Sequence, residues 1–358
     1  MISFATEANI TRVVEEIFDS FSPDLFGKKV LIKPNFVITA DPERAITTHP
    51  SILKAILEVV RHYGGKPIVG DNGMRPKSGE IPGMNEACGQ YLKNIGASSV
   101  LKNIGGYEVP ISADVLEADF IINVPKFKSH VLTGISVCIK NMFGIIPGNY
   151  KSRMHAITGH AKVLTQFFVD LYKWRTPDFN IVDAIIGMEG NGPTSGSPRE
   201  IGKVIAGYNG VEVDTVCAYM MGFGDPRSIK LLDLANQKGL GDIDLKKIDV
   251  TGDLEMIRDF EKPSTYTLHL KEAKKSVFAE RAQDFFDVLD KLGHIIPQCD
   301  DEKCIQCGEC EEVCPAGAIN LDPYPVLNRG KCISCFCCSE ICVSGAMKVL
   351  EGEEIEMR

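Results

Sequence analysis

The last sixty residues of this 358-residue chain contain a duplicated cysteine pattern. The first run, with two, two and three residues between its cysteines, is Cys304, Cys307, Cys310 and Cys314. The second run repeats this spacing 28 residues later, at Cys332, Cys335, Cys338 and Cys342. Ten of the thirteen cysteines lie in residues 299–358, and only three lie in residues 1–298. The repeat and the concentration of cysteines in this part of the chain indicate a separate C-terminal segment that is organised around cysteine-bound metal.

The spacing favours iron–sulfur clusters over other thiol sites. Structural zinc sites usually present two separated Cys-x2-Cys pairs, without a third cysteine at the same step. Disulfide frameworks are typical of exported domains, and the N-terminus lacks the basic and apolar regions of a secretion signal. Three closely spaced thiolates in one turning loop can each reach one iron of a cube, which leaves the fourth iron to a ligand from elsewhere.

The segment resembles the two-cluster bacterial ferredoxins over about its last 60 residues. In that family the fourth cysteine of each run ligates the cluster of the other run. The resemblance implies two [4Fe–4S] clusters. The first-run cluster would be held by Cys304, Cys307, Cys310 and Cys342, and the second-run cluster by Cys332, Cys335, Cys338 and Cys314.

Three positions depart from the ferredoxin pattern. Val343 stands where the family has a proline after the last cysteine, and Cys299 and Cys337 are additional. We expect both additional cysteines to be packed or free thiols. Because Cys337 lies between two ligands, the alternative is that it competes with them for iron.

The charge of the chain is divided in the same way as its cysteines. Residues 299–358 hold twelve acidic and five basic residues, a net charge of −7, whereas the remainder has a net charge of −2. An acidic chain without a long basic run argues against nonspecific nucleic-acid binding. The acidic segment favours pairing with a basic redox partner protein. No apolar run reaches the roughly 18 residues of a membrane span, so we expect a cytoplasmic protein, and oxygen-sensitive clusters suggest an anaerobic setting.

Residues 1–297 are predicted to alternate between strands and helices. Apolar runs predict strands at 30–32, 67–70, 120–124 and 180–186, with weaker ones at 203–206 and 248–251. Helical patterns begin at Pro50, follow His130 as far as Phe143, and recur near 155–173, 211–221 and 228–238.

This order predicts an α/β domain over 1–297, whose partly parallel sheet carries helices on both faces. A helix at about 271–293 would connect it to a small α+β ferredoxin-like domain at 298–358.

Polar residues collect where the predicted strands end, and ligands of open α/β sheets bind beyond the carboxyl ends of strands. Residues 126–155 include five Lys or Arg and two His but no Asp or Glu, which suits an anionic small-molecule substrate. The candidate anion-binding residues are Lys33, Asn35, His49, Lys126, Lys128, Lys140, Asn141 and Glu189. The candidate catalytic residues are His130, His155, Asp71 and Asp183.

Each candidate catalytic residue is chosen for the chemistry of its side chain. Histidine titrates near neutral pH, so His130 or His155 could transfer the proton that accompanies electrons. Asp71 or Asp183 could orient a histidine or bind a substrate hydroxyl. The structural alternative is that strand-end lysines are ordinary solvated surface and that Asp183 only caps a turn.

Several segments resemble the family catalogued as domain of unknown function 362. They are Leu31–Asn35, Thr48–Pro50, Pro125–His130, Lys140–Gly144, Val182–Pro193 and Val211–Asp214. The resemblance spans about residues 28–255, and family members often carry the same ferredoxin-like tail. It supports the α/β domain and the choice of site residues. Because the general activity of the family is unsettled, it implies no substrate.

Two kinds of function are compatible with these features. The first is an iron–sulfur oxidoreductase of the ferredoxin type, whose clusters relay electrons to or from an anionic substrate or a bound organic cofactor at the strand-end loops. The second is a non-catalytic electron-transfer module, or a ligand-binding or assembly protein, that docks a redox partner. The chain has neither the Rossmann glycine spacing nor a P-loop, so the sequence does not identify an organic cofactor.

Overall fold

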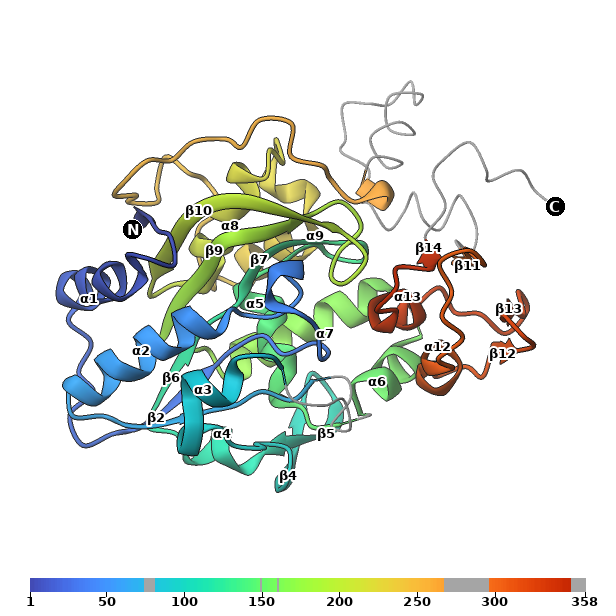
Figure 1. Ribbon diagram of the computed structural model, residues 1–358, viewed down its shortest axis with the longest axis horizontal. Coiled ribbons are helices and arrows are strands. Elements are labelled where there is room, and N and C mark those ends of the chain that lie inside the picture. Colours follow the sequence, from blue (N-terminus) through green and yellow to red (C-terminus); the bar gives the residue numbers. More distant parts are fainter. Residues whose placement is uncertain (74–80, 149, 160, 267–295, 349–358) are drawn as a thin grey trace.

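The computed structural model describes residues 1–73, 81–148, 150–159, 161–266 and 296–348. The connecting helix predicted at about 271–293 lies outside the described residues. Within them, the α/β fold is confirmed as a mixed eight-stranded sheet with helices on both faces, beside a small C-terminal segment of short strands and helices (Figure 1). None of the helices over these residues combines the length and the apolar character that a membrane crossing requires.

The sheet has the strand order β1-β10-β9-β6-β2-β3; off this path, β7 pairs with β9, and β8 pairs with β7. The strands are β1 (Ile2–Phe4), β2 (Lys29–Lys33), β3 (Lys66–Val69), β6 (Phe120–Asn123), β7 (Lys126–His130), β8 (Gly134–Ser136), β9 (Phe179–Glu189) and β10 (Ser197–Gly207). β2 pairs in parallel with β3 and β6, and β9 pairs in parallel with β6 and β7. β10 is antiparallel to both of its neighbours. The parallel strands bring the loops after β2, β3 and β6 to one edge of the sheet.

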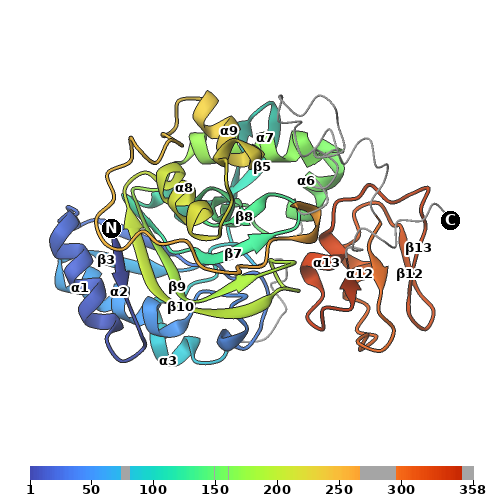
Figure 2. The same ribbon diagram turned by 90° about the horizontal axis from the view of Figure 1, so that it is seen from above.

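Alternating strand residues form two cores. Val30 and Ile32 of β2 belong to the core that packs with α1 (Ile10–Phe21) and α2 (Pro50–His62), whereas Leu31 belongs to the core on the opposite face. Successive side chains of a strand point to opposite faces, so one apolar run supplies both layers. The second face is covered by α5 (Cys138–Asn141), α6 (Tyr150–Thr158), α7 (Ala161–Trp174), α8 (Gly210–Met220) and α9 (Lys230–Gln237) (Figure 2).

Short elements complete the α/β part. They are α3 (Met84–Cys88), α4 (Ala113–Glu117), the hairpin of β4 (Ser99–Ile104) and β5 (Tyr107–Ser112), and the 3-10 turns η1 (Pro42–Arg44), η2 (Gly89–Tyr91), η3 (Met142–Ile145) and η4 (Pro226–Ser228). Of these, η3 continues directly from α5 and contributes to the site described below.

Three predictions about local structure are wrong. Residues 126–130, predicted to be a loop beyond a strand, form β7. The helix expected directly after His130 begins only at Cys138, because β8 intervenes. Residues 248–251 form no strand, although the Thr251 carbonyl accepts a hydrogen bond from the main chain of β1. All five residues of β7 are buried, so this strand lies in the interior of the protein. Its polar side chains made the segment look like an exposed loop in the sequence.

The C-terminal segment packs against the α/β part through its second half. It contains β11 (Gln298–Cys299) paired with β14 (Met347–Lys348), β12 (Ile319–Leu321) paired with β13 (Pro325–Leu327), α12 (Glu309–Val313) and α13 (Cys337–Ile341). In both views α13 lies toward the sheet, and β12 and β13 lie farther out (Figures 1 and 2). Ile341 packs with Ile38, Ile46 and Met188, and Thr194 Oγ1 donates to the Ser339 carbonyl at 3.1 Å.

Candidate substrate cavity and cysteine centre

A cavity of about 50 Å³ lies where the strand-end loops meet α13. Six predicted site residues line it, namely Asn35, Asp71, His130, Lys140, Asn141 and His155. The C-terminal segment contributes Glu340 to the same cavity. The topology therefore brings together residues that are far apart in the sequence, and the cavity is completed by both parts of the chain.

Lys140 is a cation of this cavity that forms no salt bridge within the described residues, although its charge acts on Glu340. Its Nζ lies 4.7 Å from the ring centre of Phe168 and 5.2 Å from that of Phe143, distances at which aromatic faces attract a cation. Over the described residues, no hydrogen bond or ion pair holds Nζ, although the side chain is only 9% exposed. Glu340 places a carboxylate in the same cavity, and a bound anion would add the close partner that a buried charge favours.

His130 presents a proton to the cavity. Its Nδ1 accepts hydrogen bonds from the main-chain nitrogens of Leu132 at 3.0 Å and Thr133 at 3.4 Å, so the proton of the neutral ring resides on Nε2. Nε2 lies 3.2 Å from Glu340 Oε1, but the contact is misaligned for a hydrogen bond. Burial lowers the pKa of His130, although Glu340 opposes this effect. His130 is therefore a neutral donor that faces the cavity.

Glu340 is a buried carboxylate that enters the cavity from α13. Burial alone would raise its pKa, but the charge of Lys140 and the contact with His130 hold the pKa well below its ordinary value. Glu340 Oε1, His130 Nε2 and His155 Nδ1 lack a hydrogen-bond partner among the described residues, although the first two face each other at 3.2 Å. Buried polar atoms are normally paired, so these three atoms in one cavity indicate a site for a polar ligand or water.

Two of the predicted lysines lie behind the cavity and support it. Lys33 Nζ lies 2.8 Å from Asp71 Oδ1, and Lys128 Nζ donates to Asn35 Oδ1 at 2.6 Å. Burial lowers the pKa of Lys128 to about 7, and the neighbouring charges of Lys140 and Lys126 contribute further. Both lysines are fully buried, so they position the loops that carry the lining residues instead of touching a ligand in the cavity.

An amide network connects the strand ends to α5. Asn35 Nδ2 donates to Asn141 Oδ1 at 2.8 Å, and Asn141 Nδ2 donates to Asn123 Oδ1 at 2.8 Å. Asp214 of α8 accepts from the main-chain nitrogens of Cys138 and Ile139 and so fixes the start of α5. This network holds the short helix that presents Lys140.

Four other predicted site residues are not brought into the cavity. Lys126 Nζ and the His49 main-chain nitrogen both donate to Asp183 Oδ2 at 2.8 Å. His49 and Lys126 line a second cavity of about 590 Å³. Glu189 lies 3.4 Å from Arg199. The roles predicted for these four residues in catalysis or anion binding stay predictions.

Sequence reasoning missed several lining residues. Lys151, Asn72, Phe143 and Glu340 line the cavity but were not among the candidates. Lys151 belongs to the cationic stretch at 126–155, so its charge was a usable signal. Burial lowers its pKa to about 8, and Asp71 opposes this effect. Glu340 had no comparable signal, because an acidic residue in an acidic segment is ordinarily exposed.

Gly144 is required by the close approach of η3 to the Lys33–Asp71 ion pair. A Cβ at this position would overlap Asp71 Oδ1 and come within 2.7 Å of Lys33 Nζ. Only glycine leaves room for this buried pair.

Substituting Gly144 by Ala should therefore lower the free energy of unfolding by about 3 kcal/mol, because the buried ion pair must shift or break. Gly224→Ala is the matched control, since a Cβ there meets nothing within 4 Å, and we expect little change. Urea unfolding followed by circular dichroism without oxygen gives the comparison. Equal unfolding midpoints for the two variants would show that the pair tolerates the methyl group.

The cysteines group across the two runs. Burial raises the pKa of Cys310 to about 11, and the neighbouring Cys342 and Cys307 raise it further. Burial likewise raises the pKa of Cys338, with contributions from Cys335, Cys332 and Cys314. The fourth cysteine of each run thus neighbours a cysteine of the other run. This thiol arrangement fits [4Fe–4S] ligation, and the two ligand sets stay a prediction.

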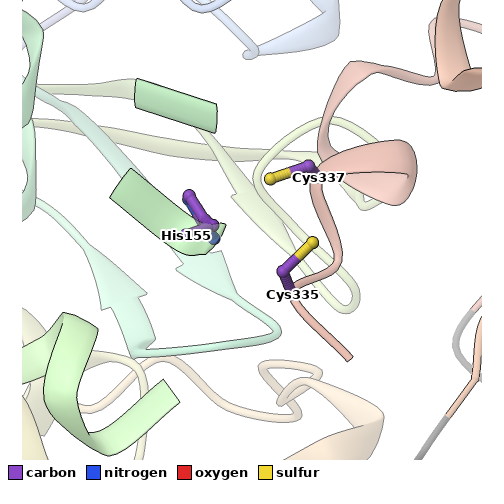
Figure 3. A group of neighbouring side chains, drawn as sticks. All are labelled: His155, Cys335 and Cys337. Atoms are coloured by element: carbon purple, nitrogen blue, oxygen red, sulfur yellow. The ribbon is translucent and has the colours of Figure 1, made fainter. Parts of the chain in front are cut away.

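The second run is the one that adjoins the cavity. Cys335 Sγ, Cys337 Sγ and a ring nitrogen of His155 all lie within 4.8 Å of one another (Figure 3). Because His155 also lines the cavity, one side chain separates the cavity from this cysteine loop. Cys307 of the first run is exposed.

The fold and the cysteines define an α/β protein with a C-terminal iron–sulfur binding segment. The family profile described as "4Fe-4S binding domain" matches residues 300–320. The profile described as "Domain of unknown function (DUF362)" matches residues 30–219, and the chain belongs to this family.

Comparison with curated proteins finds a relative of similar sequence. The chain is 32% identical over 226 residues to the "Thylakoid-associated protein sll1697" of Synechocystis sp., covering 60% of this chain and 69% of the relative. Among solved structures, the lactate racemase apoprotein from Thermoanaerobacterium thermosaccharolyticum is similar, with 15% identity and a TM-score of 0.38. The likeness covers 57% of this chain and only about half, 52%, of that structure, and carries no conclusion about fold or function.

Proposed function

We propose that this protein is an iron–sulfur oxidoreductase in which two [4Fe–4S] clusters relay electrons to or from a small anionic substrate. The substrate would bind in the cavity between the strand-end loops and α13. The observation that supports this most directly is Lys140, a buried cation that forms no hydrogen bond or salt bridge over the described residues, beside a segment that carries the cluster cysteines. In this proposal the α/β domain covers 1–297 and the ferredoxin-like domain 298–358.

The size of the cavity limits the substrate. Its volume of about 50 Å³ is well below the roughly 150 Å³ of an engineered protein cavity that accepts benzene. A carboxylate or another anionic group of a few non-hydrogen atoms suits this space. A flavin or nicotinamide is far larger, so our proposal for this cavity does not include an organic cofactor.

The residues of the cavity have separate roles in the proposal. Bound [4Fe–4S] clusters supply or accept single electrons. Lys140 holds the anion and neutralises charge that develops on it, in a setting where burial strengthens the electrostatic interaction. His130 holds a transferable proton on Nε2, which faces the cavity. Asn35 and Asn141 keep the loops in place through their amide network.

The position of the two cysteine runs suggests an order of electron transfer. The second-run loop contacts His155, so its cluster would be the one beside the substrate. The exposed Cys307 suggests that the first-run cluster is the one that exchanges electrons with a protein partner. The net charge of −7 over residues 299–358 favours a basic redox protein as that partner.

Purification without oxygen tests the proposed function. We expect about eight irons and eight sulfides per chain, as two cubane clusters require, together with a small anion that mass spectrometry detects after denaturation. About four irons, or about one zinc per run, would refute the two-cluster assignment. A full cluster complement with no small molecule, but tight capture of a redox protein, would support the non-catalytic electron-transfer module instead.

A further inference from the structure

Cys337 has no counterpart in the first run and no place in the predicted ligand sets. The position 28 residues earlier is Glu309. Cys337 is the first residue of α13 and is completely buried. Its sulfur lies within 4.8 Å of Cys335 Sγ and of a ring nitrogen of His155, which belongs to α6 (Figure 3). Three side chains that can bind a metal ion therefore meet where the C-terminal segment joins the α/β part.

His155 brings a ring nitrogen that nothing in the described part of the chain satisfies. The residue is only 4% exposed, and its Nδ1 has no hydrogen-bond partner there. The ring makes a T-shaped contact with Phe143, with the ring centres 6.3 Å apart. An apolar neighbour thus fixes the ring without pairing its nitrogen. Leaving a buried polar atom unpaired is costly, and a metal ion is a common partner of a neutral imidazole.

The separations suit a single ion. Two zinc–sulfur bonds of about 2.3 Å at a tetrahedral angle place the two sulfurs about 3.8 Å apart. A zinc–nitrogen bond of about 2.0 Å places the nitrogen about 3.5 Å from each sulfur. The three atoms already lie within 4.8 Å of one another. Small rotations of the side chains are enough to bring them to the separations of a zinc site.

The ligand types favour zinc. Thiolate and imidazole ligands suit this ion, whereas magnesium and calcium take oxygen ligands. The two thiolates of Cys335 and Cys337 offset the charge of a divalent ion, which lowers the cost of burying it. Two cysteines and one histidine form one of the ligand sets of catalytic zinc, in which the fourth position is left to water or a substrate atom.

Cys335 takes part in two sites in this arrangement. The proposed function assigns it to the second-run cluster. A thiolate sulfur has enough lone pairs to bind a cluster iron and a second metal ion at the same time, so one sulfur atom can join the ion to the cluster. His155 also lines the anion cavity. An ion on His155 would therefore lie beside the cavity as well as beside the cluster.

We infer that His155, Cys335 and Cys337 bind one zinc ion, and that Cys335 bridges this ion and the second-run cluster. The inference deepens the proposed function and rests on it, since the bridge requires that cluster. Zinc does not change its oxidation state, so the ion carries no electrons itself. Its contribution is that of a Lewis acid, which binds and polarises the small anion through the fourth position.

Metal analysis of the full-length protein, purified without oxygen and supplied with about one equivalent of zinc chloride, tests the site. We expect about one zinc per chain in addition to about eight irons. X-ray absorption at the zinc edge is blind to iron, and it should show two sulfur neighbours at about 2.3 Å and one protein nitrogen at about 2.0 Å.

Single substitutions separate the zinc ion from the cluster. His155→Ala and Cys337→Ala should each lose the zinc and keep about eight irons, whereas Cys335→Ala should lose the zinc together with about four irons. Cys88→Ala is the matched control, because it removes a buried cysteine of α3 and should change neither content. The visible absorbance of the clusters shows whether each variant is folded.

Failure of the inference and failure of the proposed function give different results. About eight irons without bound zinc would refute the zinc site and leave the proposed function intact. Loss of about four irons from His155→Ala or Cys337→Ala would make that residue a cluster ligand instead. Zinc retained in Cys335→Ala would refute the bridge. About four irons in the unaltered protein would refute the two-cluster function and the bridge with it.

Discussion

Replacing Lys140 by Met is expected to weaken binding of the small anion about 100-fold, with both clusters retained. The methionine fills a similar volume but removes the cation that forms no salt bridge over the described residues. Truncating one member of a buried charge pair costs about 3 kcal/mol, which corresponds to this loss of affinity. Calorimetric titration with the anion released from the purified protein measures the change, and the visible absorbance of the clusters monitors their retention.

Two control variants separate binding from folding. Lys66→Met removes an exposed lysine at the start of β3 and should leave the affinity unchanged. Lys128→Met should lower stability, because Asn35 Oδ1 and the Ile46 carbonyl lose their buried donor. An unchanged affinity in Lys140→Met, or a loss of affinity that only parallels a loss of cluster absorbance, would rule out Lys140 as the anion-binding residue.

Alanine at the fourth cysteine of each run should remove the cluster of the other run. Cys342→Ala should lose about four irons. Its remaining cluster should show the same electron paramagnetic resonance signal and midpoint potential as the remaining cluster of Cys304→Ala. Cys314→Ala should instead match Cys332→Ala. The structural basis is the proximity of Cys342 to Cys310 and of Cys314 to Cys338.

The paired variants make this prediction independent of which signal belongs to which cluster. If Cys342→Ala matched Cys332→Ala, each run would hold its own cluster and crossed ligation would be wrong. Loss of all iron from either variant would show that the two clusters cannot form separately. Iron and sulfide analysis, followed by redox titration monitored by electron paramagnetic resonance, distinguishes these results.

The convergence of the site followed from the order of the strands. Asn35, Asp71 and His130 come from separate segments, and the rule that ligands bind at the carboxyl ends of parallel strands placed them together in advance. Lys140 and His155 were candidates because they belong to a stretch without acidic residues. For these residues, the sequence pattern and the strand topology both predict a position at the site.

Other features could not be read from local pattern. Lys126 and Lys128 were expected near the substrate, but β7 is entirely buried and their charges are satisfied inside the protein. A polar sequence ordinarily indicates solvent exposure, and only tertiary partners such as Asp183 and Asn35 make this strand possible. The contribution of α13 to the cavity depends on how the C-terminal segment packs against the α/β part. The hydrophobic periodicity of the sequence does not predict that packing.

The inward placement of α13 has a consequence for how this protein can diverge. Glu312 and Glu340 occupy the same place in the two halves of the cysteine repeat, 28 residues apart. The first is on the surface, whereas the second is buried beside Lys140 and His130. The two matching glutamates of the repeat are thus under unequal structural constraints. Mutational drift at position 312 alters a solvent-facing charge, whereas drift at position 340 alters the cavity itself. An ordinary ferredoxin grafted in place of this segment would therefore carry electrons without completing the cavity.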